Sequence, residues 1–299
     1  MTELLRLHGR LSDIATGLRV RRLLPALARR SVGPFVFFDH FGPVTLAAEV
    51  DSDVGGHPHI GLATVTYLFE GRQVHRDSLG TVQTIVPGAV NWMTAGRGIV
   101  HSERMHEDDR GQARPAHGLQ LWVALPQALE DSAPSFQHVP EAAIPVCQLP
   151  GGVQARVLVG QAWGLTSPVR TASSTLYLDL TLPPQAAMTL PALAAELALY
   201  SPTTGLRVDG DAVGAGEMVV LPAHRGAELL AGAEGARLVV IGGEPLARPV
   251  RMWWNFVARD RQRLADAARR WAEGGFDPIP GETERLAAPP WRDTDPPAA

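Results

Sequence analysis

Two short doublets of metal-binding side chains are the part of this sequence best suited to chemistry. The first is His57-Pro58-His59 and the second is His101-Ser102-Glu103. In an extended strand, residues at positions i and i+2 point to the same face of the sheet. If the two strands face each other, the doublets bring three imidazoles and one carboxylate to a single point.

This donor set indicates a transition-metal site. Three nitrogens and one oxygen suit Fe(II), Mn(II), Ni(II), Cu(II) or Zn(II) better than calcium or magnesium. Four protein ligands leave two open positions on an octahedral ion, as a catalytic site requires. Glycines precede both doublets, at Gly55-Gly56 and Gly96-Arg97-Gly98, where they allow close approach of another backbone. We therefore predict His57, His59, His101 and Glu103 as the ligands of a catalytic metal.

The bulk composition excludes several other classes of function. The 299 residues contain 27 basic and 31 acidic side chains, a net charge of −4, which gives no electrostatic case for binding nucleic acid or an anionic membrane. Cys147 is the only cysteine, so no disulfide can form within the chain. No apolar run reaches the roughly 18 residues that span a bilayer, and residues 1–10 lack the apolar core of a secretory signal. These features predict a soluble, cytoplasmic protein.

The elements that must position the doublets are predicted to be short strands. Thirty glycines and twenty-five prolines punctuate the chain and favour strands and turns over long helices. Segments rich in β-branched and aromatic residues are expected to be strands; they lie at 61–71, 81–86, 119–125, 175–180, 197–200, 217–221 and 237–241. Residues 205–211 predict a strand followed by a tight turn. The fold class expected is mainly β.

The domain organisation expected is two strand-rich halves and a tail. We predict an N-terminal metal-binding domain over 1–135, a Pro- and Gly-rich linker over 136–152, a second domain over 153–248, and a C-terminal helix and tail over 249–299. The helix is expected from Trp254 to Trp271, where apolar residues recur at helical spacing. Gly274-Gly275 would end it.

With the doublets and strands in place, the chain resembles the pirin family. Besides the two doublets, the stretches that carry the resemblance are 34–42, 66–71, 91–103, 116–123, 175–179 and 242–246. The resemblance extends over roughly residues 30 to 250. Residues 251–257, with Trp253-Trp254-Asn255-Phe256, depart from the usual pirin pattern and indicate a subgroup.

The resemblance implies a bicupin, in which two jelly-roll β-barrels occupy one chain. It implies one iron in the N-terminal barrel, held by His57, His59, His101 and Glu103, and a C-terminal barrel without metal. The general cupin pattern has a ligand carboxylate four or five residues after the second histidine, where this chain has Ala63 and Thr64. Glu103 on the opposite strand is expected to replace it.

Three functions are compatible with this site. The first is a metal-dependent dioxygenase of the quercetin 2,3-dioxygenase type, with a flavonol as substrate and Glu103 as general base. The second is a non-enzymatic regulator, whose surface changes with the metal's redox state and binds a partner protein. The third is a cupin with another small substrate, because the ligands set the metal and the pocket sets the substrate.

Other titratable side chains are assigned more ordinary roles. His40 is expected either to line a pocket or to be buried beside aromatic residues, and His117 to be a hydrogen-bonded structural histidine. Glu70 is expected in a solvated turn and His106 in a solvated loop, and His224 is expected to have a structural or surface role. The tripeptide His75-Arg76-Asp77 resembles part of a kinase catalytic loop, but the other kinase motifs are missing. Phe37 and Phe41 could line an apolar pocket above the metal.

Overall fold

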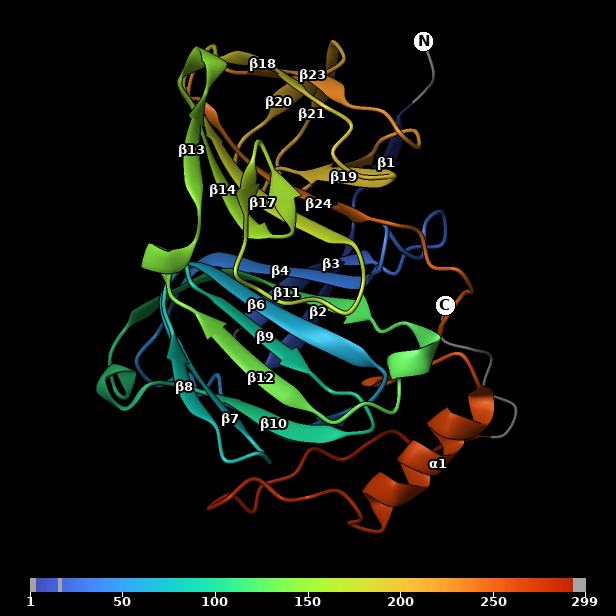
Figure 1. Ribbon diagram of the computed structural model, residues 1–299. Coiled ribbons are helices and arrows are strands. Elements are labelled where there is room, and N and C mark those ends of the chain that lie inside the picture. Colours follow the sequence, from blue (N-terminus) through green and yellow to red (C-terminus); the bar gives the residue numbers. More distant parts are fainter. Residues whose placement is uncertain (1–3, 16–17, 293–299) are drawn as a thin grey trace. The chain divides into compact units, whose positions relative to one another are not determined.

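The computed structural model describes residues 4–15 and 18–292, which form two compact units (Figure 1). Unit 1 contains the N-terminal segment to Arg10, Arg21–Phe38 and Val139–Leu246. Unit 2 contains Leu11–Val20, Asp39–His138 and the C-terminal segment from Ala247. Neither unit is a continuous stretch of the chain, and the C-terminal segment belongs to the same unit as both doublets.

Unit 1 is built on two antiparallel sheets. In the described part of the chain, the larger sheet has seven strands, in the order β1 (Leu5–Leu7), β22 (Met218–Val220), β19 (Glu196–Tyr200), β24 (Ala236–Gly243), β17 (Thr175–Leu182), β14 (Val153–Val159) and β13 (Val146–Leu149). The smaller has four, in the order β18 (Ala187–Leu190), β23 (Ala227–Ala231), β20 (Leu206–Val208) and β21 (Asp211–Val213). The short pair β15 (Gln161–Ala162) and β16 (Leu165–Thr166), with 3-10 turns η3 (Glu141–Ala143) and η4 (Pro150–Gly152), completes the unit.

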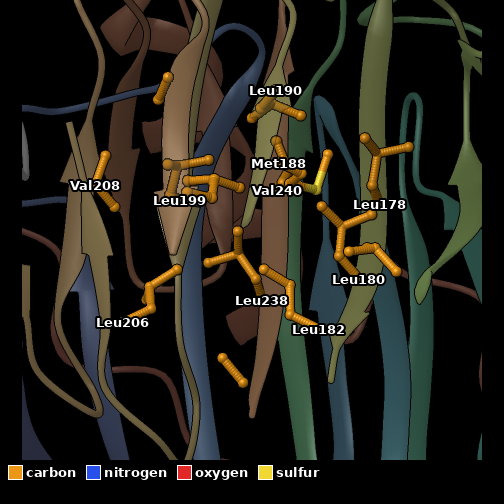
Figure 2. Packing of buried hydrophobic residues seen from close by; sticks show 14 of the residues in the cluster. Leu178, Leu180, Leu182, Met188, Leu190, Leu199, Leu206, Val208, Leu238 and Val240 are labelled. Carbon is orange, nitrogen blue, oxygen red and sulfur yellow. The ribbon is translucent and has the colours of Figure 1, made fainter. Parts of the chain in front are cut away.

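The core of unit 1 lies between these two sheets (Figure 2). Leu178, Leu238 and Val240 come from the larger sheet, and Met188 and Val208 from the smaller one. Leu178, Leu238 and Val240 have no exposed surface. Alternate residues of a strand point to one face, so these period-two apolar positions bury one side of each sheet against the other.

Unit 2 has the same pairing of a larger and a smaller sheet. Among the described residues, its larger sheet runs β12 (Ser135–Val139), β9 (Val90–Thr94), β6 (Leu62–Glu70), β11 (Arg114–Ala124), β4 (Phe35–Leu46), β3 (Leu18–Leu24) and β2 (Arg10–Ala15). Some residues of these strands are counted with unit 1: Arg10, residues 21–24, residues 35–38 and Val139. Its smaller sheet runs β5 (Val54–His59), β10 (Ile99–Arg104), β7 (Gln73–Asp77) and β8 (Val82–Ile85). The 3-10 turns η1 (Glu107–Asp109) and η2 (Gln127–Leu129) connect strands. Both doublets are therefore on the smaller sheet.

The C-terminal part of unit 2 is a hairpin followed by a helix. The hairpin pairs β25 (Arg251–Trp253) with β26 (Phe256–Ala258), and the helix α1 covers Arg261–Ala272. The predicted helix start at Trp254 is therefore wrong by seven residues. The Asp260 side chain accepts a hydrogen bond from Gln262 N and caps the helix at that point.

Helix α1 packs its apolar face onto this hairpin. The buried helix residues Leu264, Ala267, Ala268 and Trp271 join a cluster with Phe256 and Phe276. Of the residues that the structure describes, none belongs to a helix long and apolar enough to cross a membrane. The mainly β architecture with a C-terminal helix confirms the predicted fold class.

Candidate metal centre

The two doublets lie on neighbouring antiparallel strands, β5 and β10. His101 pairs directly with His57, and Ile99 with His59. One ring nitrogen from each of His57, His59 and His101 lies within 4.8 Å of the other two. The exposed fractions of these side chains are 7%, 1% and 1%, so the three imidazoles meet in the interior of unit 2. The expected convergence of the three histidines is present.

Strand β5 tolerates proline because β10 is the only one of the four strands of the smaller sheet that pairs with it; on its outer side the C-terminal segment bonds at Gly56. Pro58 cannot donate a hydrogen bond, and an edge strand does not need that donor on its outer side. With Pro58 directed away, the i, i+2 spacing leaves His57 and His59 on the inner face.

The carboxylate of Glu103 lies beside the histidines because Glu103 follows His101 by two residues on β10, which keeps a regular register with β7 from His101 to Arg104. The β5–β10 pairing is irregular at this point: His101 pairs with His57, but Glu103 pairs with Val54, one residue farther than regular pairing gives. The extra residue of this bulge is on β5, at Gly55-Gly56. Glu103 Oε2 lies 3.8 Å from His57 Nε2, and the Glu103 side chain is 15% exposed.

Backbone carbonyls orient two of the imidazoles. His57 Nδ1 lies 2.9 Å from the Gly55 carbonyl oxygen, and His59 Nδ1 lies 2.9 Å from the Asn255 carbonyl oxygen. A carbonyl oxygen only accepts, so both Nδ1 atoms carry the proton and donate. In a neutral ring with this tautomer, the Nε2 atom carries the lone pair that can bind a cation.

A histidine and an aspartate on β7 orient the third imidazole. His75 Nε2 donates to Asp77 Oδ2 at 3.0 Å, which leaves His75 Nδ1 as an acceptor. His101 Nδ1 lies 3.4 Å from His75 Nδ1 and donates to it. Burial raises the pKa of Asp77, but hydrogen bonds from His75 and Thr81 outweigh burial and hold this pKa below its usual value. The charged carboxylate therefore sets the tautomers of both histidines.

These tautomers leave ring-nitrogen lone pairs facing one another. His59 Nε2 and His101 Nε2 are 3.1 Å apart, and in the neutral rings with the proton on Nδ1 both of these nitrogens present lone pairs. Two nitrogens each about 2.1 Å from one ion and about 90° apart would be separated by about 3.0 Å. Burial, followed by the proximity of His57, holds the pKa values of His59 and His101 well below the usual value. Neutral, converging imidazoles fit a divalent transition metal.

Replacing the Asp77 carboxylate with an amide is expected to weaken metal binding, because it changes the tautomer of His101. In Asp77→Asn, the amide would donate to His75 Nε2, so the protons on His75 and His101 would shift and His101 Nε2 would be protonated. We expect the metal dissociation constant to rise about 10- to 100-fold. Competition titration against a chelator measures this change, and Asp108→Asn in the exposed η1 turn is the control. Equal metal affinities of Asp77→Asn and the unmodified protein would contradict the tautomers assigned to His75 and His101.

Aromatic rings surround the histidines. The Trp122 ring on β11 of the larger sheet meets the His59 ring edge-on at 5.1 Å between centroids. Phe136 on β12 stacks on His75 at 4.5 Å. The metal centre thus lies between the two sheets of unit 2. Phe37 and Phe41 were expected to line an apolar pocket above the metal. Phe41 packs against Leu68, Ile85 and Ala89. Phe37 belongs to unit 1, whereas the histidines belong to unit 2.

The remaining titratable residues are outside the triad of histidines. His40 and His117 are a second buried pair, with Nε2 atoms 3.0 Å apart, which confirms His117 as a hydrogen-bonded structural histidine. The side chain of Glu70 is 57% exposed. His224 is also exposed, whereas His106 is half-buried at the start of η1 and accepts from Asp108 N.

Sequence reasoning missed the groups that orient the imidazoles. His75 and Asp77 have the same i, i+2 spacing as the two doublets and lie on a strand adjacent to β10, so that spacing was a usable signal. Asn255 acts through its backbone carbonyl, which every residue type possesses. No signal in the side-chain sequence could have identified it.

Comparisons with known proteins find relatives along most of the chain. A profile of the pirin family matches residues 17–123, and a profile of the pirin C-terminal cupin domain matches residues 177–277. A pirin-like protein of Caulobacter vibrioides is 41% identical over 258 residues, covering 85% of this chain and 88% of the relative.

Two further relatives bear the name of an enzyme. A Pseudomonas aeruginosa protein, provisionally named a quercetin 2,3-dioxygenase, is 39% identical over 293 residues, covering 95% of this chain and 90% of its own. The crystal structure of a protein named quercetin 2,3-dioxygenase from Acinetobacter baumannii superimposes with a TM-score of 0.89 at 36% identity, covering 98% of this chain and 97% of the other.

Proposed function

This chain belongs to the pirin family, and from that premise we propose that it is an iron-dependent dioxygenase of the quercetin 2,3-dioxygenase type. The observation that carries the proposal is the meeting of three buried imidazoles beside the Glu103 carboxylate. The relatives from Pseudomonas aeruginosa and Acinetobacter baumannii support the same reaction class.

His57, His59, His101 and Glu103 would hold the metal. We propose Fe(II) as the resident ion, with Mn, Ni, Cu and Zn as the alternatives to be compared. When bound, the ion supplies a Lewis acid that lowers the pKa of a coordinated hydroxyl group, together with open positions for small molecules. The neutral histidines bind and position it, and the charged Asp77 stabilises the tautomer of His101 through His75.

Glu103 has a second role in this proposal, as general base. Its carboxylate is adjacent to the imidazole cluster and partly exposed, so it can take the 3-hydroxyl proton of a flavonol. The nearly complete burial of His59 and His101 keeps bulk water away from these two imidazoles. In the overall reaction one dioxygen is consumed, the central ring of the flavonol opens, and carbon monoxide is released.

An aerobic assay of the iron-loaded protein with quercetin tests this function. We expect loss of the flavonol absorbance with release of carbon monoxide, and no reaction with metal-free protein. Glu103→Gln should lower kcat by about 10²- to 10⁴-fold, because an amide cannot take the proton. Absence of ring cleavage with all five metals would refute the proposal and leave the regulator as the alternative.

The regulator alternative has its own test. Binding of a partner protein should then differ among the oxidised, reduced and metal-free forms, and identical pulldowns would exclude it. For either function we propose a cytoplasmic location, because the single cysteine, Cys147, cannot form a disulfide within the chain.

A further inference from the structure

A segment near the C-terminus, residues 279–286, extends the smaller sheet of unit 2 beside the first doublet. Gly56 N donates to the Glu284 carbonyl at 3.2 Å, and Leu286 N donates to the Gly56 carbonyl at 2.8 Å. Arg285 forms a parallel bridge with Gly56. A Cβ atom on Gly56 would lie 2.8 Å from the Glu284 carbonyl oxygen, so this approach needs glycine next to His57.

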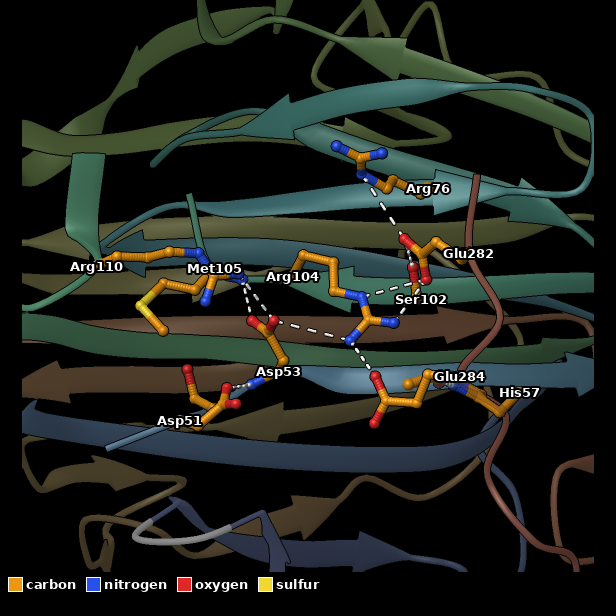
Figure 3. Close-up of polar contacts among 12 residues, drawn as sticks. Asp51, Asp53, His57, Arg76, Ser102, Arg104, Met105, Arg110, Glu282 and Glu284 are labelled. Carbon is orange, nitrogen blue, oxygen red and sulfur yellow. Dashed lines mark hydrogen bonds and ion pairs between the residues drawn. The ribbon is translucent and has the colours of Figure 1, made fainter. Parts of the chain in front are cut away.

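From this segment, the Glu282 side chain binds β10 on both sides of Glu103 (Figure 3). Ser102 Oγ donates to Glu282 Oε1 at 2.9 Å. Arg104 donates to Glu282 Oε2 from Nη2 at 2.6 Å and from Nε at 3.2 Å. Ser102 and Arg104 alternate with Glu103 along the strand, so Glu282 contacts the face opposite to the imidazoles.

These contacts occur where the β5–β10 pairing is interrupted. The register shift between His101 and Glu103 leaves Ser102 without a paired residue on β5. At this point backbone pairing holds β10 on one side only, where Ser102 pairs with Arg76 of β7. Glu282 supplies side-chain bonds from the side of β5 to the two residues that flank Glu103.

Further charged side chains hold Arg104 in place beside Glu282. Arg104 Nη1 lies 2.7 Å from Glu284 Oε2 and 3.7 Å from Asp53 Oδ2. Asp53 in turn accepts from Met105 N at 2.6 Å. The side chains of Arg104 and Glu282 are only 15% and 11% exposed, so water competes weakly for their hydrogen bonds. Figure 3 shows these side chains linking β10 to the C-terminal segment.

We propose that Glu282 is a positioning residue for the metal centre. By holding Ser102 and Arg104, Glu282 fixes the part of β10 whose pairing with β5 is irregular, and so keeps Glu103 directed toward His57. This inference rests on the metal site of the proposed function, but not on its substrate. Loss of an outer-shell partner of this kind typically weakens metal binding about 10- to 100-fold.

Four variants separate the contacts of Glu282. Glu282→Ala removes the contacts with Ser102, Arg104 and also Arg76, whose Nε lies 3.7 Å from Glu282 Oε1. Glu282→Gln retains an acceptor for Ser102 but removes the charge, and Ser102→Ala removes one hydrogen bond. Glu284→Gln is the matched control, because Glu284 also contacts Arg104 but its side chain is 63% exposed and the structure gives it no bond to Ser102.

Co(II) is the probe, because its d–d absorption bands report the ligands around the ion. We expect the dissociation constant of Co(II) to rise about 10- to 100-fold in Glu282→Ala, with bands shifted toward those of Glu103→Ala. Glu282→Gln and Ser102→Ala should lie between this variant and the unmodified protein, and Glu284→Gln should change affinity less than about 3-fold. The unfolding midpoint of each metal-free variant reports general destabilisation separately.

The outcomes distinguish this inference from the proposed function. Unchanged affinity and bands in Glu282→Ala, with normal binding by the unmodified protein, would overturn the positioning role and leave the metal site intact. Failure of the unmodified protein to bind Co(II) would overturn both. If Glu282→Ala does not fold, unchanged bands in Glu282→Gln and Ser102→Ala would overturn the positioning role.

Discussion

Replacing His101 with alanine is expected to reduce the bound metal from one ion per chain to nearly none and to abolish quercetin cleavage. The substitution removes the Nε2 atom that lies 3.1 Å from His59 Nε2, and it also removes the donor to His75. A direct ligand is lost, so the affinity should fall by more than the about 10- to 100-fold typical of outer partners. Elemental analysis of protein purified without added metal measures the stoichiometry.

The control for this variant is His106→Ala. His106 caps the η1 turn, and its side chain contacts Asp108, from whose N it accepts and whose Oδ2 lies 3.4 Å from His106 Nδ1, so its removal should leave metal content and activity unchanged. Retention of one ion per chain at normal affinity by His101→Ala would mean that the three imidazoles are not the metal site. Loss of metal in His106→Ala as well would indicate a general effect on folding.

The second large effect is expected at Gly96, in the turn before β10. Gly96 has φ +52°, and a Cβ there would lie 2.0 Å from the Ser132 carbonyl oxygen. Gly80 has φ +85° with nothing within 4 Å of the same position. Left-handed backbone costs a residue other than glycine about 1–2 kcal/mol. Gly80→Ala should therefore lose about that much, and Gly96→Ala about 2–5 kcal/mol because the steric clash is added.

Tryptophan fluorescence during denaturant unfolding is a suitable measurement. Of the seven tryptophans, only Trp163 lies in unit 1, so the signal reports mainly on unit 2. The difference between the two alanine variants isolates the contact with Ser132, since both share the backbone cost. Equal losses in the two variants would show that the Ser132 carbonyl moves aside without cost.

Strand positions were predictable because they depend on local spacing. The stretch predicted at 61–71 is β6 (Leu62–Glu70), and that at 175–180 lies within β17 (Thr175–Leu182). The helix start was not predictable from the sequence. Phe256, Val257 and Ala258 are three consecutive apolar residues, all buried in β26, and they show neither the two-residue period of a half-buried strand nor the 3.6-residue period of a helix. A short, wholly apolar run does not distinguish a buried strand from a helix.

The sequence by itself determined which residues could bind a metal and that each doublet presents its side chains on one face. Both properties follow from residue type and the period of two in a strand. Only the tertiary structure decided the distant partners around these residues: the Asn255 carbonyl, 196 residues from His59, and the Glu282 carboxylate, 180 residues from Ser102. The physical reason is that a hydrogen bond depends on distance and direction in space. A backbone carbonyl or a common surface carboxylate has no feature in the sequence that identifies its distant donor.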